Sequence, residues 1–100
     1  MSFWKRKRAT ASARHILVAD LAQCEALKAE IENGADFAEL ARQHSSCPSA
    51  NKGGDLGEFR ERQMVKEFND VVFSAALHTV HGPVKTQFGY HLIEITARNS

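Results

Sequence analysis

Residues 13–18 carry apolar side chains on both faces of an extended chain, because His15 and Leu17 fall on one face and Ile16 and Val18 on the other. Successive side chains of a strand point to opposite faces, so both faces of this segment need cover. The pattern therefore predicts a short strand that is buried on both sides.

Two amphipathic helices are expected after this strand. Asp20 is a favoured N-cap residue with Gln23 three positions later, and Gly34 is suited to ending the helix. The apolar positions of this first helix are Cys24, Leu27 and Ile31. A similar cap at Asp36 predicts a second, shorter helix that ends near His44.

The composition changes over residues 45–57, which are rich in Ser, Gly and Pro. We expect a long loop without regular structure here. Long loops inside compact domains are uncommon and are functional in many proteins, so this segment is a candidate for part of a site.

The second half of the chain predicts a short strand around Phe59, a helix over residues 65–73 and a hairpin near the C-terminus. The hairpin has strands over 84–86 and 90–97, a three-residue loop over 87–89, and a chain break before it at Gly82-Pro83. In its last strand His91, Ile93 and Ile95 share a face. This order of elements does not alternate regularly, so the prediction is an α+β domain with a small, mainly antiparallel sheet.

The chain of 100 residues has the size of one domain, and 43% apolar and 25% charged residues are ordinary for a globular protein. No apolar run approaches the roughly 20 residues of a membrane-spanning helix, and no secretory signal is recognised, so a cytosolic location is expected. Cys24 and Cys47 are 23 positions apart and predict neither a disulfide scaffold nor a metal site.

Charge is distributed unevenly along the chain, although the net charge is only +1. Five of the thirteen Lys and Arg residues precede His15, whereas all Asp and Glu residues follow it. We expect residues 1–12 to form a basic, flexible tail and residues 13–100 to form a mildly acidic folded domain. An acidic body does not suit a nucleic-acid groove, so a nucleic-acid partner is not expected.

Three groups of residues could carry chemistry. His15 and His91 stand in the two clearest strands and either fill the core or meet across the sheet, where one ring can donate to the other. Cys47 lies in the long loop and is either a nucleophile or a polar group that lines a cleft, but no helix begins directly after it to support a nucleophile. A group of apolar side chains could form either core or a small pocket for an aliphatic ring: Met64, Phe68 and Phe88.

Six segments occur together in an order that resembles the parvulin family of peptidyl-prolyl cis/trans isomerases, over about residues 13–98. They are Arg14-His15-Ile16-Leu17-Val18, Gly34-Ala35-Asp36-Phe37, Ser45-Ser46-Cys47-Pro48, Gly53-Gly54-Asp55-Leu56-Gly57, Gln63-Met64-Val65-Lys66-Glu67-Phe68 and Gly82-Pro83-Val84 with Gln87-Phe88-Gly89-Tyr90-His91. The resemblance, to small single-domain bacterial parvulins, implies an FKBP-like α+β fold: a four-stranded antiparallel sheet flanked by helices.

The resemblance also implies roles for individual residues. His15 and His91 would be the paired histidines beneath the cleft, Thr86 the hydroxyl beside them, and Cys47 the group that faces the isomerising bond. The proline ring would be held by Leu56, Met64, Phe68 and Phe88. Some family members carry Asp where this chain has Cys47, which favours an electrostatic role over nucleophilic attack.

The implied function is isomerisation of Xaa-Pro bonds in unfolded or flexible protein segments, without a cofactor and by a monomer. Relatives directed to phosphorylated Ser-Pro or Thr-Pro carry basic residues just after the first strand, whereas this chain has Ala19-Asp20-Leu21, so phosphate-directed specificity is not expected. The same apolar cleft would also suit a non-catalytic peptide-binding or holdase chaperone module. A cysteine hydrolase is the least favoured alternative.

Overall fold

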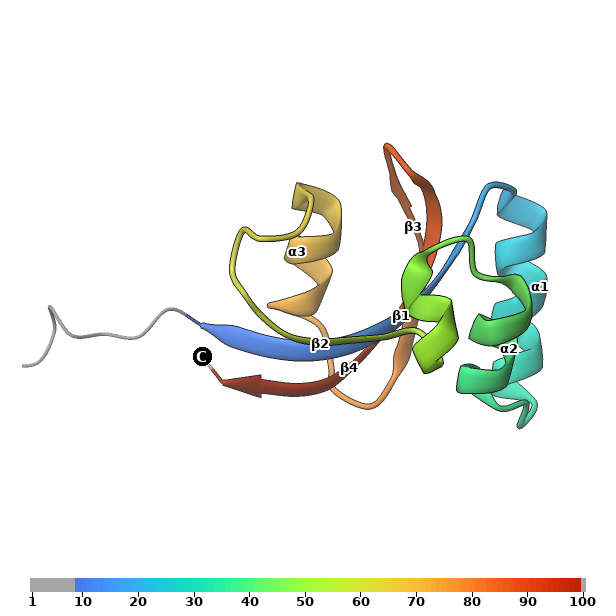
Figure 1. Ribbon diagram of the computed structural model, residues 1–100, viewed down its shortest axis with the longest axis horizontal. Helices are drawn as coiled ribbons and strands as arrows, with labels where there is room; N and C mark the ends of the chain where they lie inside the picture. Colours follow the sequence, from blue (N-terminus) through green and yellow to red (C-terminus); the bar gives the residue numbers. More distant parts are fainter. Residues whose placement is uncertain (1–8, 100) are drawn as a thin grey trace, which may run out of the picture.

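A four-stranded antiparallel sheet forms the centre of the molecule in a computed structural model that describes residues 9–99 (Figure 1). Its strands stand in the order β2-β1-β4-β3. Their bounds are Thr10–Val18 for β1, Asp55–Arg60 for β2, Val80–Thr86 for β3 and Gly89–Asn99 for β4. The predicted α+β class with a four-stranded antiparallel sheet is confirmed.

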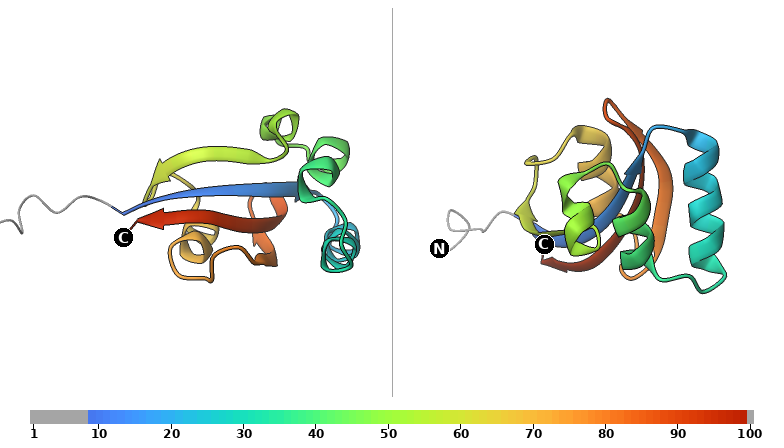
Figure 2. Two further views of the ribbon diagram at one scale, coloured as in Figure 1. Left: turned by 90° about the horizontal axis from the view of Figure 1, so that it is seen from below. Right: turned by 45° about the vertical axis from the view of Figure 1, so that its right-hand side comes forward.

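The helices cover the sheet on both faces. They are α1 (Leu21–Glu32), α2 (Phe37–His44), α3 (Lys66–Val72) and the short 3-10 helix η2 (Pro48–Lys52). In the right-hand view of Figure 2 the strands run between α3 and α1. Because successive residues of β1 point to opposite faces, this arrangement buries both sides of the strand, as its sequence pattern predicts.

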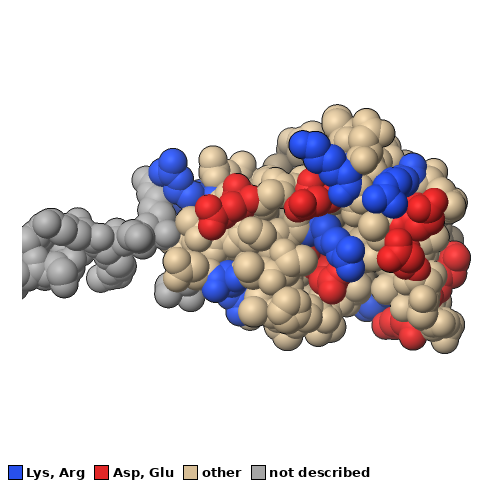
Figure 3. Space-filling model, turned by 60° about the horizontal axis from the view of Figure 1, so that its bottom comes forward, with Lys and Arg blue, Asp and Glu red and all other residues tan. Residues whose placement is uncertain are grey.

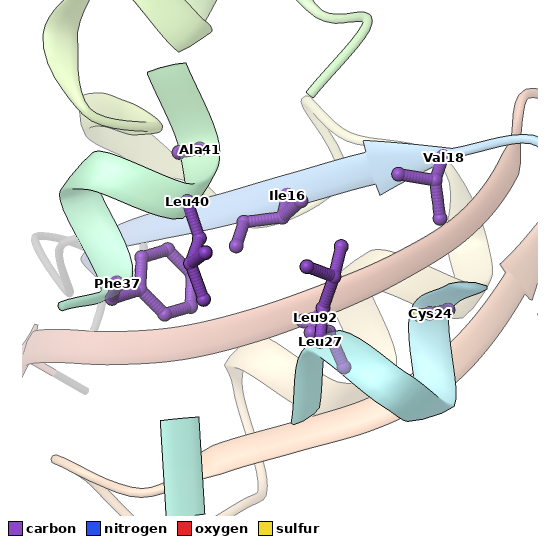
Figure 4. Close-up of a cluster of buried hydrophobic side chains, with 8 residues drawn as sticks. All are labelled: Ile16, Val18, Cys24, Leu27, Phe37, Leu40, Ala41 and Leu92. Carbon is purple, nitrogen blue, oxygen red and sulfur yellow. The ribbon is translucent and has the colours of Figure 1, made fainter. Parts of the chain in front are cut away.

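Two hydrophobic clusters correspond to these two faces. One joins α1 and α2 to the sheet and consists of Ile16, Val18, Cys24, Leu27, Phe37, Leu40, Ala41 and Leu92 (Figure 4). The other lies under α3 and consists of Ala11, Ala13, Phe59, Phe68, Val72, Ile93 and Ile95. The alternation along β4 therefore sends Leu92 to one cluster and Ile93 to the other, which fixes how the strand faces its two layers.

Both predicted helix caps are present. The Asp20 carboxylate accepts a hydrogen bond of 2.9 Å from the Gln23 N–H, and the Asp36 carboxylate accepts one of 3.0 Å from the Glu39 N–H. These bonds satisfy N–H groups that a helix start leaves without a backbone partner. Gly34 follows the first helix with a φ of 104°, a conformation that favours glycine.

The strand β1 begins at Thr10, so the prediction of a tail over residues 1–12 is wrong at its C-terminal end. Thr10 pairs with Asn99, which places the end of β4 beside the start of β1 (Figure 1). Backbone pairing with β2 and β4 on either side draws these residues into the sheet. The rest of the predicted tail, residues 1–8, lies outside the described residues.

Three local predictions differ from the structure. Residues 45–57 are not wholly irregular, because they contain η2 and the start of β2. Gly82-Pro83 does not break the chain: β3 runs through it, with a shift of register between His81 and Val84 against β4. The hairpin loop has two residues rather than three, since Gly89 already pairs with Thr86.

Charged side chains of both signs share the surface. Figure 3 shows a face on which Lys and Arg are interspersed with Asp and Glu. Exposed ion pairs join Arg42 to Glu39 and Lys66 to Asp70. No helix among the described residues is long and apolar enough to cross a membrane. The cytosolic location and the absence of a nucleic-acid partner stay predictions.

Candidate active site

A cleft of about 410 Å³ opens on the α3 side of the sheet. It is lined by His15, Leu17, Ser46, Cys47, Pro48, Leu56, Met64, Val65, Phe68, Phe88 and His91. Seven of the eight site residues predicted from the sequence are in this set. The eighth, Thr86, lies behind the lining and reaches it through a hydrogen bond to His91.

The two histidines meet in the sheet beneath the cleft. His15 pairs with Ile93, and His91 pairs with Leu17, so the two rings are diagonal neighbours on adjacent strands. Their Nδ1 atoms are 3.0 Å apart, and the rings stack with an interplanar angle of 19°. The expectation that they meet across the sheet is confirmed.

Thr86 determines which of the two histidines donates the hydrogen bond between them. Its Oγ1 accepts a hydrogen bond of 3.1 Å from the Phe88 N–H and lies 2.7 Å from His91 Nε2. If the hydroxyl proton points to His91 Nε2, then His91 carries its proton on Nδ1 and donates it to His15 Nδ1. We assign these tautomers because they give the hydroxyl proton a partner, whereas the reverse direction leaves it with none among the described residues. His15 then carries its proton on Nε2, a buried atom with no hydrogen-bond partner among the described residues.

Both histidines are neutral at neutral pH. Burial, reinforced by repulsion from His91, lowers the pKa of His15 to about 4. Burial also lowers the pKa of His91. Phe68 packs edge-on against both rings, with ring centroids 5.4 and 5.5 Å away, and adds to their desolvation.

The apolar wall of the cleft comes from three elements. Leu56 lies on β2, Phe68 on α3, and Phe88 at the tip of the β3–β4 hairpin, with Met64 before α3. Phe68 is buried and belongs to the hydrophobic core as well as to the cleft. Phe88 is 60% exposed, so the hairpin tip presents an aromatic ring with little cover of its own. An exposed aromatic side chain beside an apolar cleft is typical of a ligand contact.

The expectation that no helix begins directly after Cys47 is wrong, because the 3-10 helix η2 starts at Pro48 with Cys47 as its cap. Proline suits this first position, where its missing N–H needs no partner. Among the described residues no hydrogen bond joins the Cys47 thiol to either histidine, and three of the four ring nitrogens are engaged within the histidine and threonine network. This arrangement supplies no general base for a thiol nucleophile. Cys24 is fully buried, and burial, with the nearby Glu25, raises its thiol pKa to about 11, so it belongs to the core as expected.

Sequence reasoning missed four residues of the lining: Leu17, Ser46, Pro48 and Val65. Leu17 shares a face with His15, and the other three stand next to predicted site residues, so adjacency was an available signal. No Asp, Glu, Lys or Arg lines the cleft in the described part of the chain. Residues 9–99 also contain no cluster of three potential metal ligands.

Proteins with similar sequences include foldases and chaperones. The chain is 44% identical over 95 residues to the foldase protein PrsA of Geobacillus sp. (strain WCH70), which covers 94% of the chain and 34% of the relative. It is 45% identical to the chaperone SurA of Legionella pneumophila, covering 85% of the chain and 22% of that protein. The chain thus spans about a third or less of the length of these curated relatives.

Solved structures agree with the fold. The peptidylprolyl isomerase PrsA from Bacillus anthracis superposes with a TM-score of 0.90 at 34% identity, covering 97% of this chain and 45% of that one. The parvuline NmPin of Nitrosopumilus maritimus gives a TM-score of 0.80 at 33% identity and covers 92% and 99%. The family model of the PPIC-type PPIase domain matches residues 3–99. With the cleft, the histidine pair and these matches together, the chain belongs to the PPIC-type peptidyl-prolyl cis/trans isomerase domain family.

Proposed function

We propose that this chain catalyses cis/trans isomerisation of Xaa-Pro bonds in unfolded or flexible segments of client proteins and so assists their folding. The observation that carries the proposal is the cleft itself, in which an apolar wall faces a neutral hydrogen-bonded network of His15, His91 and Thr86. The same role as part of a longer foldase would fit the relatives, of which the chain covers only a part.

Rotation about the bond before proline is slow because the amide resonance must be broken, at a barrier of about 18–20 kcal/mol. An apolar wall that grips the proline ring removes the amide from water, and resonance that separates charge is weaker in such surroundings. Leu56, Met64, Phe68 and Phe88 would provide this grip. Only contacts that are stronger to the twisted bond than to the planar bond accelerate the isomerisation.

The polar side of the cleft would act on the twisted bond. Cys47 lies in the lining together with both histidine rings. Because the histidines are neutral, they would hold the floor of the cleft rigid without adding a charge that needs solvation. No covalent step is needed, since no bond of the substrate breaks.

A phosphorylated residue before the proline is not the preferred substrate in this proposal. Such a group would need cations at the cleft, and its lining in the described chain contains none. Asp20, which follows β1 where phosphate-directed relatives carry basic residues, caps α1 with its carboxylate.

The test is NMR exchange spectroscopy of a short Xaa-Pro peptide with and without the protein. We expect faster cis/trans exchange with wild type, a clear loss with Phe88→Ala, and no change with Glu30→Ala on the exposed side of α1. Phe88 suits the test because its ring is 60% exposed and contributes little to the core. Peptide line broadening without added exchange would overturn the proposal in favour of a binding or holdase module, and peptide cleavage would favour a hydrolase.

A further inference from the structure

Among residues 9–99, the last part of β1 has no strand partner on the side of β2. Pairing with β2 ends at Arg14, which stands opposite Asp55, and one further bond of 2.9 Å runs from the His15 N–H to the Gly54 carbonyl. The backbone N–H and C=O of Leu17 on this side therefore need other partners. Two serines of the segment that follows α2 supply them.

Ser45 accepts two hydrogen bonds at a single oxygen. Its Oγ accepts a bond of 3.0 Å from the Leu17 N–H and a longer one of 3.4 Å from the Cys47 N–H. The second bond closes a turn of the kind that serine side chains form with the backbone two residues on. Ser45 is itself anchored at the end of α2, because its N–H donates to the Ala41 carbonyl at 2.9 Å. Ser45 thus joins three parts of the chain, since its hydroxyl oxygen binds β1 and the backbone of Cys47 and its own N–H binds the end of α2.

The two residues that this oxygen joins both line the cleft, whereas Ser45 does not. Leu17 belongs to the strand that carries His15, and Cys47 belongs to the loop wall beside it. We propose that Ser45 is a positioning residue of the isomerase site: its hydroxyl oxygen sets where Cys47 stands relative to β1. The proposal rests on the proposed function, and it explains how a loop rich in Ser and Gly holds a side chain in place.

Ser46 offers a matched control for amide hydrogen exchange in the same segment. Its hydroxyl donates to the Leu17 carbonyl at 3.1 Å, but its own backbone N–H already donates to that carbonyl at 2.8 Å. Removal of the Ser46 hydroxyl therefore leaves the carbonyl paired. Removal of the Ser45 hydroxyl leaves the N–H groups of Leu17 and Cys47 without their acceptor.

A double-mutant cycle tests whether Ser45 acts through Cys47. We expect Ser45→Ala to lower kcat/KM by roughly tenfold, mainly through kcat, Ser45→Thr to restore it, and Glu30→Ala, outside the cleft, to change it less than about twofold. In the Cys47→Ala background Ser45→Ala should cost less than about twofold, because the group that it positions is gone. No loss with Ser45→Ala, or equal losses in both backgrounds, would overturn the proposal.

Amide hydrogen exchange gives a readout that does not depend on catalysis. In Ser45→Ala the N–H groups of Leu17 and Cys47 should exchange at least about tenfold faster than in wild type or in Ser46→Ala, while those in the centre of β4 keep their rates. Unchanged exchange at both amides refutes the positioning role even in an active enzyme. If wild type shows no isomerase activity, the proposed function fails, and this measurement still decides whether Ser45 holds the loop.

Discussion

We expect the buried His15 ring to make the folded chain less stable as the pH falls from 7 to 4. The ring has a pKa of about 4 in the folded state, against 6.5 without the surrounding protein, because of burial and of repulsion from His91. In the window between these values the unfolded chain binds the proton more tightly. The free energy of unfolding therefore falls as the pH falls through this window and rises as the pH rises through it.

The size of this effect follows from the two pKa values. Between pH 7 and pH 5 the shift of His15 alone removes about 2 kcal/mol from the free energy of unfolding. A proton on His15 Nδ1 can be accommodated only if His91 reverses its tautomer and donates to Thr86. Two protonated rings would bring two N–H groups together over 3.0 Å and break the hydrogen bond between them.

Urea denaturation at several pH values measures this contribution. We compare wild type with His15→Gln, which removes the titrating ring, and with Gln43→Ala on the exposed side of α2 as a control that removes no titrating group. Comparison with wild type cancels carboxylates that titrate in all three proteins. The loss between pH 7 and pH 5 should shrink by about 2 kcal/mol in His15→Gln and stay unchanged in Gln43→Ala. An unchanged loss in His15→Gln, or an NMR titration that places the His15 pKa near 6.5, would refute the reasoning.

Three further variants test the cleft and its frame. Phe88→Ala should raise KM for a proline peptide by about tenfold, because covering half of the exposed part of an aromatic ring is worth about 1.5 kcal/mol; an unchanged KM in steady-state kinetics would remove the ring from the binding site. Cys47→Ser should lower kcat/KM by less than about tenfold, whereas a loss of several orders of magnitude, or a trapped covalent adduct, would indicate nucleophilic catalysis. Gly54→Ala should cost at least about 2 kcal/mol more in urea denaturation than Gly57→Ala, since both glycines have positive φ but only a Cβ at Gly54 would overlap the His15 carbonyl; equal costs would contradict this.

For the histidine pair, periodicity along each strand predicts burial but not which strands are neighbours. Alternation along the first and last strands placed His15 and His91 on inward faces, and the structure buries both. Whether two strands are neighbours, and in which register, depends on contacts far apart in sequence. The pairing of Leu17 with His91, which brings the rings together, is such a contact.

The breaker signals show where local reasoning fails. Gly and Pro at 82–83 predict an interruption, yet β3 continues through them because β4 pairs on both sides of the shift in register. In the same way β1 extends to Thr10 through pairing with Arg60 and Asn99, although the local sequence there resembles a tail. Tertiary pairing overrides a local preference of this size.

The sequence by itself determined the elements whose signals are local: the two capped helices, the first and last strands, which are buried on both faces, and the glycine-rich segment that contributes to the site. These depend on side-chain spacing and on hydrogen bonds between near neighbours. Only the tertiary structure decided the strand order, the direction of the Thr86–His91–His15 network and the link from Ser45 to β1. The physical reason is that these features join residues from distant parts of the chain, which come within hydrogen-bonding distance only after the sheet has formed.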